Sequence, residues 1–217
     1  MRTYQIYPLG DRALTIDFGN KIDEAINRLV IAAFNQLQKA PLPTMIEAVP
    51  AYSTLAIYYQ PAIIKKMHPA RTAFETMKEL TEAWLNKLDP GENDGEERKI
   101  EVPVWYFDEF KDLIEIHTSR EYRVYMLGFL PGFAYMGEVD ERIAFPRKPQ
   151  PVMVLAGSVG IAGKQTGVYP AASPGGWQII GRTPIQLFKP QDARPTLFHA
   201  GDKVKFYSIS KDEFDNY

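Results

Sequence analysis

The residues best suited to chemistry lie in residues 142–191, a stretch that contains no Asp or Glu. It carries six positive charges, so the rest of the chain has a net charge of −8, against −2 for the whole chain. The six are Arg142, Arg147, Lys148, Lys164, Arg182 and Lys189. Because a solvated surface normally mixes both signs, this pattern predicts a concave site for a carboxylate or a phosphate. The alternative is a basic face that meets an acidic partner subunit or the chain's own linker.

Glycine is concentrated in the same part of the chain, since ten of the fifteen glycines lie between residues 128 and 181. Glycine allows positive φ and a close approach of the main chain to a ligand. Loops of this composition have N–H groups that can point at an anion. Tight β-turns and bulges are the alternative explanation.

Familiar catalytic patterns are not met. Residues 157–164 resemble a phosphate-binding loop, but the glycine spacing is one residue too long and Gln165 stands where Ser or Thr is needed. Ser158 and Ser173 lack the first glycine of a nucleophile elbow. The three histidines are scattered, so we expect no metal site. One of them, His117, is predicted to have a capping role at a helix end.

Two regions must position these residues, and the first, residues 1–88, alternates strand and helix. Strands are expected at 4–8, 13–18, 45–49 and 54–59, and helices with apolar residues three and four apart at 22–37 and 74–88. This order predicts a small sheet with two helices on one face. The fold class expected here is an α+β sandwich close to the ferredoxin-like type.

The second region, residues 99–217, follows a polar and mostly acidic segment, 89–98, that we interpret as a linker. Beyond a short helix at 108–117, the region contains short β-like runs and no further helical period. Strands are expected at 100–106, 122–127, 152–155, 177–180, 184–188 and 203–207. The pattern predicts a mainly β barrel or sandwich.

The composition is that of a soluble globular protein, with 217 residues, 45% of them hydrophobic and 24% charged. The near-neutral charge gives no reason to expect a nucleic acid or a membrane as partner. Cysteine is absent, which excludes disulfides and thiolate metal sites. Because no run of residues is typical of a signal peptide or a membrane span, we expect a cytoplasmic protein.

Five ordered blocks of sequence carry a resemblance to a known family. They are GFLPGFAYMG at 128–137, FPR at 145–147, AGSVGIAG at 156–163, QTGVYP at 165–170 and SPGGWQIIGRTP at 173–184. With LGD at 9–11 and AGD at 200–202, they resemble the 5-oxoprolinase B-subunit family, also called the kinase A inhibitor family or allophanate hydrolase subunit 1. The chain departs from that family in a shorter segment before His117 and at Ala134, Glu138 and Leu155.

The resemblance implies an α/β domain followed by a cyclophilin-like β-barrel. It also implies a subunit that is inactive alone and that works with homologues of the 5-oxoprolinase A- and C-subunits. In that complex 5-oxoproline (pyroglutamate) is cleaved to glutamate with ATP, bound with Mg. Related domains form the carboxyltransferase part of biotin-dependent urea carboxylases and of allophanate hydrolase systems, and one member inhibits a sporulation histidine kinase. Because Lys78 lies in a helical pattern and not on a hairpin between methionines, the chain itself is expected to carry no biotin.

For an enzyme subunit we interpret Arg147 and Arg182 as electrostatic clamps, assisted by Tyr135 and Ser158. Opening a resonance-stabilised lactam with ATP needs such cations and oriented N–H donors around phosphoryl and carboxylate oxygens. The residues expected to bind substrate are Gly157, Gly160, Gly163, Gln165, Tyr169, Ser173, Gly175 and Gly176. A structural arginine that bonds turn carbonyls is the alternative for Arg182. The catalytic base and nucleophile are expected from a partner subunit.

For a regulatory module the residues of interest are apolar. Phe129, Leu130, Phe133 and Met136 are predicted to form a docking patch for a histidine kinase. Burial in the barrel core is the alternative for Phe129, Phe133 and Trp177. A third hypothesis, proline isomerisation by analogy with cyclophilin, is disfavoured because a fold does not carry a function.

Overall fold

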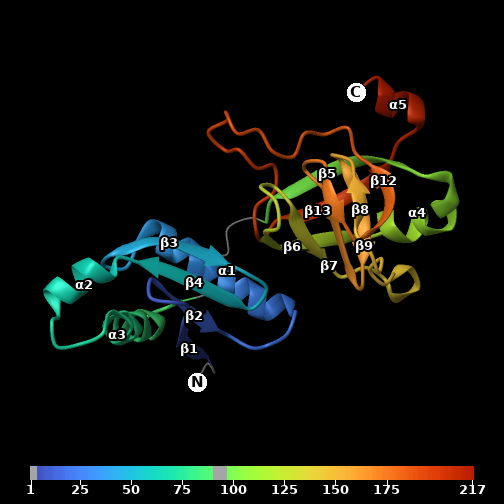
Figure 1. Ribbon diagram of the computed structural model, residues 1–217. Coiled ribbons are helices and arrows are strands. Elements are labelled where there is room, and N and C mark those ends of the chain that lie inside the picture. Colours follow the sequence, from blue (N-terminus) through green and yellow to red (C-terminus); the bar gives the residue numbers. More distant parts are fainter. Residues whose placement is uncertain (1–3, 90–96) are drawn as a thin grey trace. The chain divides into compact units, whose positions relative to one another are not determined.

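The computed structural model describes residues 4–89 and 97–217. The chain divides into two compact units, residues 1–96 and 97–217, and each is described separately (Figure 1). Residues 90–96 of the predicted linker lie outside the described residues, so the linker stays a prediction.

The first unit is built on a four-stranded antiparallel sheet with the order β1-β2-β4-β3. Its elements are β1 (Gln5–Pro8), β2 (Ala13–Asp17), α1 (Glu24–Lys39), β3 (Met45–Pro50), β4 (Thr54–Tyr59), α2 (Pro61–Met67) and α3 (Ala73–Leu85). Every second residue of β4 is buried, namely Leu55, Ile57 and Tyr59. Helix α1 contacts β3 and β4, and helix α3 contacts β2. The sheet therefore turns one apolar face toward the helices.

The helices of this unit begin where the sequence supplies caps. The side chain of Asp23 accepts a hydrogen bond from the Ile26 N–H, and Thr72 and Glu75 form a capping box at the start of α3. Helix α2 was not expected, because its seven residues are too few to show a helical period.

The ferredoxin-like part of the fold prediction is not confirmed. That fold has the order β-α-β-β-α-β, whereas this unit begins with two consecutive strands and ends with two consecutive helices. Strands β1 and β2 pair directly as a hairpin across Gly10, which has a φ of 63°. Because glycine adopts this left-handed conformation without steric cost, the chain turns back before any helix forms.

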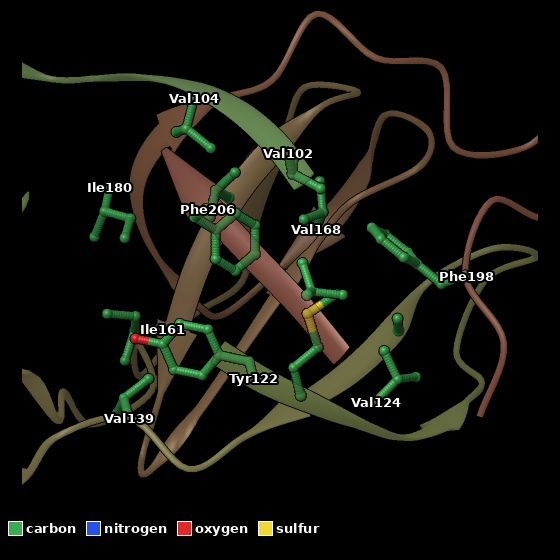
Figure 2. Close-up of a cluster of buried hydrophobic side chains, with 14 of the residues drawn as sticks. Val102, Val104, Tyr122, Val124, Val139, Ile161, Val168, Ile180, Phe198 and Phe206 are labelled. Carbon is green, nitrogen blue, oxygen red and sulfur yellow. The ribbon is translucent and has the colours of Figure 1, made fainter. Parts of the chain in front are cut away.

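The second unit is a closed seven-stranded barrel with the order β10-β7-β6-β13-β5-β12-β9. Its strands are β5 (Lys99–Tyr106), β6 (Glu121–Leu127), β7 (Ala134–Gly137), β9 (Ser158–Ala162), β10 (Gln165–Val168), β12 (Gln178–Arg182) and β13 (Lys203–Ser208). Strands β5 and β13 run parallel, and the other printed pairs of the barrel are antiparallel. Figure 2 shows valine, isoleucine and aromatic side chains from these strands pointing toward one another inside the barrel.

Shorter elements lie around the barrel. Strands β8 (Val152–Val154) and β11 (Ser173–Gly175) form a separate two-stranded sheet, called the β8–β11 ribbon below. The remaining elements are the 3-10 helices η2 (Asp108–Phe110) and η3 (Glu141–Ile143) and the helices α4 (Lys111–Thr118) and α5 (Lys211–Asp215). The barrel prediction is confirmed.

Two details of the strand prediction were wrong. Residues 184–188 form no strand, and only Phe188 bridges to Thr196. Strands β7, β9, β10 and β11 were missed, because glycine and short polar residues within them hide the alternation of apolar side chains.

Candidate functional site

The outer face of β9 and β10 is lined with glycine. Val159 and Ile161 point into the barrel, so Gly160 of the same strand faces outward, opposite Gly167 of β10. A Cβ added at Gly167 would lie 2.8 Å from the Ala134 carbonyl oxygen and 3.1 Å from the ring of Trp177. The glycines therefore let large rings lie directly on these strands.

Five aromatic residues cover this glycine-lined face and are called the aromatic cluster below. They are Phe129, Phe133, Tyr135, Tyr169 and Trp177. The ring of Phe133 lies 4.9 Å from that of Tyr135, 5.1 Å from that of Tyr169 and 5.3 Å from that of Trp177, each edge to face. Edge-to-face contacts at these separations add stability beyond simple burial. The cluster is therefore a second, smaller core on the outside of the barrel.

Tyr169 is the polar centre of the aromatic cluster. Burial raises the pKa of its hydroxyl, while the Trp177 main-chain hydrogen bond and the Arg147 charge act in the opposite direction. A Cβ at Gly175 would lie 2.5 Å from the Tyr169 hydroxyl, so only glycine fits beside it. Glycine at position 175 of the β8–β11 ribbon therefore leaves the space that the Tyr169 hydroxyl occupies.

Ser173 lies two residues before Gly175 on the same face of β11, with Val154 of the aromatic cluster's core as its cross-strand partner. Its Oγ is buried and has no hydrogen-bond partner among the described residues. An unpaired buried hydroxyl costs about 1–3 kcal/mol, so it calls for an explanation. A ligand group that pairs with Ser173 would supply one.

Arg147 is exposed beside Tyr169 and forms no ion pair within the described ranges 4–89 and 97–217. The neighbouring Lys148 N–H donates to the Gly176 carbonyl at 2.7 Å. Gln178 donates to the Pro146 carbonyl at 3.4 Å. These bonds attach the Arg147 segment to the turn after β11, so the structure brings Arg147, Tyr135, Tyr169, Ser173, Gly175 and Gly176 into one region, the candidate site.

Arg182 has different partners. Its Nη2 donates to the Ala156 carbonyl at 3.1 Å, and its guanidinium lies 5.4 Å from the ring centre of Phe214 in α5. It is the cross-strand neighbour of Ser158, whose side chain faces outward beside it. The structure thus agrees with the alternative role for Arg182, a structural arginine that bonds a turn carbonyl. The Ser158 carbonyl accepts from the Tyr169 N–H at 2.9 Å, but among the described residues no hydrogen bond joins the Ser158 side chain to the candidate site.

The predicted anion-binding role of the glycine N–H groups is wrong at two positions. The Gly157 N–H donates to the Tyr169 carbonyl at 2.7 Å, and the Gly163 N–H donates to the Phe145 carbonyl at 2.6 Å. Gly160 lies inside the barrel ladder between β10 and β12. Positive φ at Gly157 and Gly163 agrees with the turn explanation instead. Gln165 is the first residue of β10. It precedes Tyr169 by four residues, which is about 13 Å along an extended chain.

The docking-patch prediction is wrong for two of its four residues. Met136 is 0% exposed and belongs to the barrel core, and Phe133 is 1% exposed at the centre of the aromatic cluster. Leu130 packs against the cluster as a partly buried side chain. Only Phe129 is exposed, at 59%. Its φ of 70° is rare for a bulky residue.

Sequence reasoning missed a buried polar network inside the barrel. His117 is 0% exposed, and its Nε2 lies 3.0 Å from the Thr166 hydroxyl, which itself donates to the Gly160 carbonyl at 3.1 Å. Thr166 has one proton, so it must accept from His117 Nε2–H. The unprotonated Nδ1 then accepts from the Tyr106 hydroxyl at 2.8 Å.

This network fixes His117 as a neutral imidazole. Burial lowers the pKa of His117 to about 3. The ring also stacks on Phe206, with ring centres 4.8 Å apart. The predicted capping role at a helix end was therefore wrong: the side chain points into the barrel, and no motif spacing in the sequence signals it.

The described residues contain neither a metal-binding cluster nor a membrane-spanning helix. Within residues 4–89 and 97–217, no group of three or more His, Cys, Asp or Glu residues is placed to hold a metal ion. In the same part of the chain, no helix is both long and apolar enough to cross a membrane.

The second unit is a closed β-barrel domain with an outer two-stranded ribbon, and the sequence of the chain matches a known domain family. Residues 4–198 match the family described as carboxyltransferase domain, subdomain C and D. The chain is also 43% identical to the 5-oxoprolinase B-subunit of Bacillus subtilis, over 99% of this chain and 96% of that protein. The chain belongs to the 5-oxoprolinase B-subunit family.

Solved structures agree with this assignment. The crystal structure of TTHA0988 is 32% identical with a TM-score of 0.76, and this chain covers 40% of that longer chain and 92% of itself. The urea carboxylase of Kluyveromyces lactis has a TM-score of 0.72 over 98% of this chain and 22% of that one. At 18% identity, that likeness shows the fold alone.

Proposed function

We propose that this protein is the B-subunit of an ATP-dependent 5-oxoprolinase, a hydrolase that opens the cyclic amide of 5-oxoproline to give glutamate. The observation that carries the proposal is the full-length likeness to a protein named as the B-subunit of that enzyme. The name implies further subunits, so we infer that the chain acts in a complex and is inactive alone. The other members are proposed to be homologues of the A- and C-subunits.

The substrate has two groups that match the candidate site. Its carboxylate is an anion that pairs with a cation, and Arg147 is an exposed cation without an ion pair in the described chain. Its lactam carbonyl is an acceptor, and the Ser173 hydroxyl is an unpaired donor. The Tyr169 hydroxyl lies beside Gly175, two residues after Ser173, and we propose that it helps to orient the substrate's ring.

The lactam is resonance-stabilised, so the carbonyl carbon must be activated before water attacks. Transfer of the γ-phosphoryl group of ATP to the carbonyl oxygen provides this activation, with ADP as the leaving group. One water then adds at the carbon and the ring C–N bond breaks, with a proton going to the nitrogen, to give an acyl phosphate; a second water hydrolyses the acyl phosphate to glutamate and phosphate. In the present chain Arg147 and Ser173 hold the substrate's oxygens and stabilise the charge that develops there. Residues 157–164 do not match a phosphate loop, so we place Mg-bound ATP, the base and the nucleophile elsewhere in the complex.

The Ser173 hydroxyl is covered in the isolated chain, so substrate reaches it only when its surroundings move. The β8–β11 ribbon is suited to such movement, because each strand has three residues and the ribbon is not part of the barrel ladder. We infer that this small ribbon shifts when the complex binds substrate.

The test is glutamate release from 5-oxoproline and ATP by the complex reassembled from purified subunits. Arg147→Ala is expected to reduce kcat/KM at least about tenfold, which corresponds to the loss of one charge-assisted hydrogen bond. Lys189→Ala is the matched control, because Lys189 is an exposed cation of the same acid-free stretch with no place in the candidate site. Equal activity of the two variants would contradict the role of Arg147, and an inactive wild-type complex would contradict the proposed function.

A further inference from the structure

The outward face of β8 is an exposed apolar surface next to the candidate site. Met153 is 68% exposed, Leu155 is 55% exposed and Val152 is 45% exposed. Val154 points the other way, into the core of the aromatic cluster, and Val152 lies on the same side as Val154 but is exposed at the end of the strand. Four successive residues thus divide into one buried anchor and three exposed apolar side chains. The exposed three, together with Lys148, are called the β8 surface below.

The main chain of β8 is also incompletely paired. Within the described part of the protein, β8 pairs with β11 alone, which leaves its other edge open. An exposed strand edge with apolar side chains is a site of unwanted association unless another chain covers it. Natural edges are protected by charges, proline, bulges or short strands; β8 is short, but residues 152–155 carry neither a charge nor a proline.

Charge indicates what kind of chain covers this surface. The β8 surface lies within the acid-free stretch 142–191, and Arg147 and Lys148 form no ion pair among the residues that the structure describes. Arg142 and Lys164, by contrast, pair with Asp140 and Glu141. Arg182 and Lys189 form no ion pair in the described chain either, but Lys148 is the cation that belongs to the β8 surface, and its charge matches a carboxylate on a partner.

We propose that the β8 surface docks a companion subunit of the enzyme, through an apolar segment of that subunit flanked by Asp or Glu. This inference rests on the proposed function, in which the chain acts with other subunits. In TTHA0988 the matching region makes up only 40% of the chain, so there the fold is covalently joined to a longer stretch of other sequence. Docking at β8 places the companion beside Ser173 of the same ribbon, where the remaining catalytic groups are needed.

The experiment measures assembly and not catalysis. The full chain is titrated with each of the other purified 5-oxoprolinase subunits of the same organism, without substrate, and the dissociation constant is measured by calorimetry. Met153→Asp and Leu155→Asp are each expected to weaken binding to one of these subunits about 10- to 100-fold, as for residues at the centre of an interface. Lys148→Glu is expected to weaken the same binding at low salt and to reduce its salt dependence.

Met67→Asp is the matched control, because Met67 is 59% exposed in the other unit, on α2. Its binding is expected to equal that of the wild type. If Met153→Asp and Leu155→Asp bind like Met67→Asp, the proposal is overturned. It is equally overturned if the wild-type chain self-associates in sedimentation and Met153→Asp abolishes this, since a second copy then occupies the surface. A wild-type complex that assembles but releases no glutamate contradicts the proposed function and leaves the docking surface intact.

Discussion

The two faces of β9 and β10 differ in how completely their polar groups are paired. On the inner face, His117, Thr166 and Tyr106 satisfy one another at 2.8–3.0 Å inside an apolar core. On the outer face, the Ser173 hydroxyl has no partner in the described chain and Arg147 has no ion pair there. The same strands therefore support one side that is complete by itself and one side that another molecule must complete. Paired buried polar groups help to specify a fold, whereas an unpaired one calls for an explanation, such as a bound water, an ion or a ligand.

Removing the centre of the inner network is expected to have the largest effect. His117→Ala leaves a cavity, an unpaired Tyr106 hydroxyl and a Thr166 hydroxyl that has lost one of its two hydrogen bonds, so the free energy of unfolding of the barrel unit should fall by about 3–5 kcal/mol. Denaturant unfolding followed by tryptophan fluorescence measures this. His68→Ala, on the other unit, is the control, and a loss as small as its loss would show that the inner network contributes little.

Low pH is expected to lower the free energy of unfolding of the barrel unit through His117. The pKa of His117 is about 3 in the folded protein, below the usual 6.5. Below pH 6.5 the unfolded chain binds a proton that the folded chain does not, so stability falls as pH falls from about 6.5 toward 3, by roughly 1.4 kcal/mol per unit. We expect His117→Gln to lose less stability than the wild type between about pH 7 and pH 5. If denaturant unfolding shows that both proteins lose the same free energy of unfolding over this pH range, the expectation is contradicted. The carboxylates are the same in both proteins, so their contribution cancels in the comparison.

Adding a side chain at Gly167 of β10, where the aromatic cluster packs on the strand, is expected to have an intermediate effect on stability. Gly167→Ala puts a Cβ 2.8 Å from the Ala134 carbonyl oxygen, and such overpacking costs about 1–3 kcal/mol. Gly176→Ala is the control, because its Cβ would meet only the Lys148 carbonyl, at 3.6 Å. Thermal unfolding should show a lower Tm for the first variant alone. Equal Tm values would mean that the outer face accommodates a larger residue.

The smallest effect on stability is expected at the outer hydroxyl. Ser173→Ala removes a group without a partner among the described residues, so the free energy of unfolding should not fall, because no hydrogen bond is lost and the desolvation cost of the buried hydroxyl is removed. Thr166→Val, which removes the paired inner hydroxyl, should lower it by about 1–3 kcal/mol. Comparable losses in the two variants would remove the distinction between the faces.

The sequence allowed the helical periods and the barrel to be predicted, because apolar spacing reports directly on burial. It did not reveal β9 and β10, since outward-facing Gly160 and Gly167 supply no side-chain pattern. Strand β7 was missed as well, and this caused the error at Met136. Once β7 is known, alternation with Ala134 places Met136 inside the barrel. The structure brings Arg147, Tyr169 and Ser173 into one region, and their role there stays a prediction. Their packing against glycines depends on contacts between distant segments, which spacing cannot show.

The most direct test of the account is the activity of the reassembled complex containing Ser173→Ala, measured beside the stability of the same variant. The account predicts a kcat/KM for glutamate release at least about tenfold below the wild type, the effect of one lost hydrogen bond to the reacting group, with no loss in the free energy of unfolding. Full activity in that complex would contradict the account, because the outer face would then not hold the substrate.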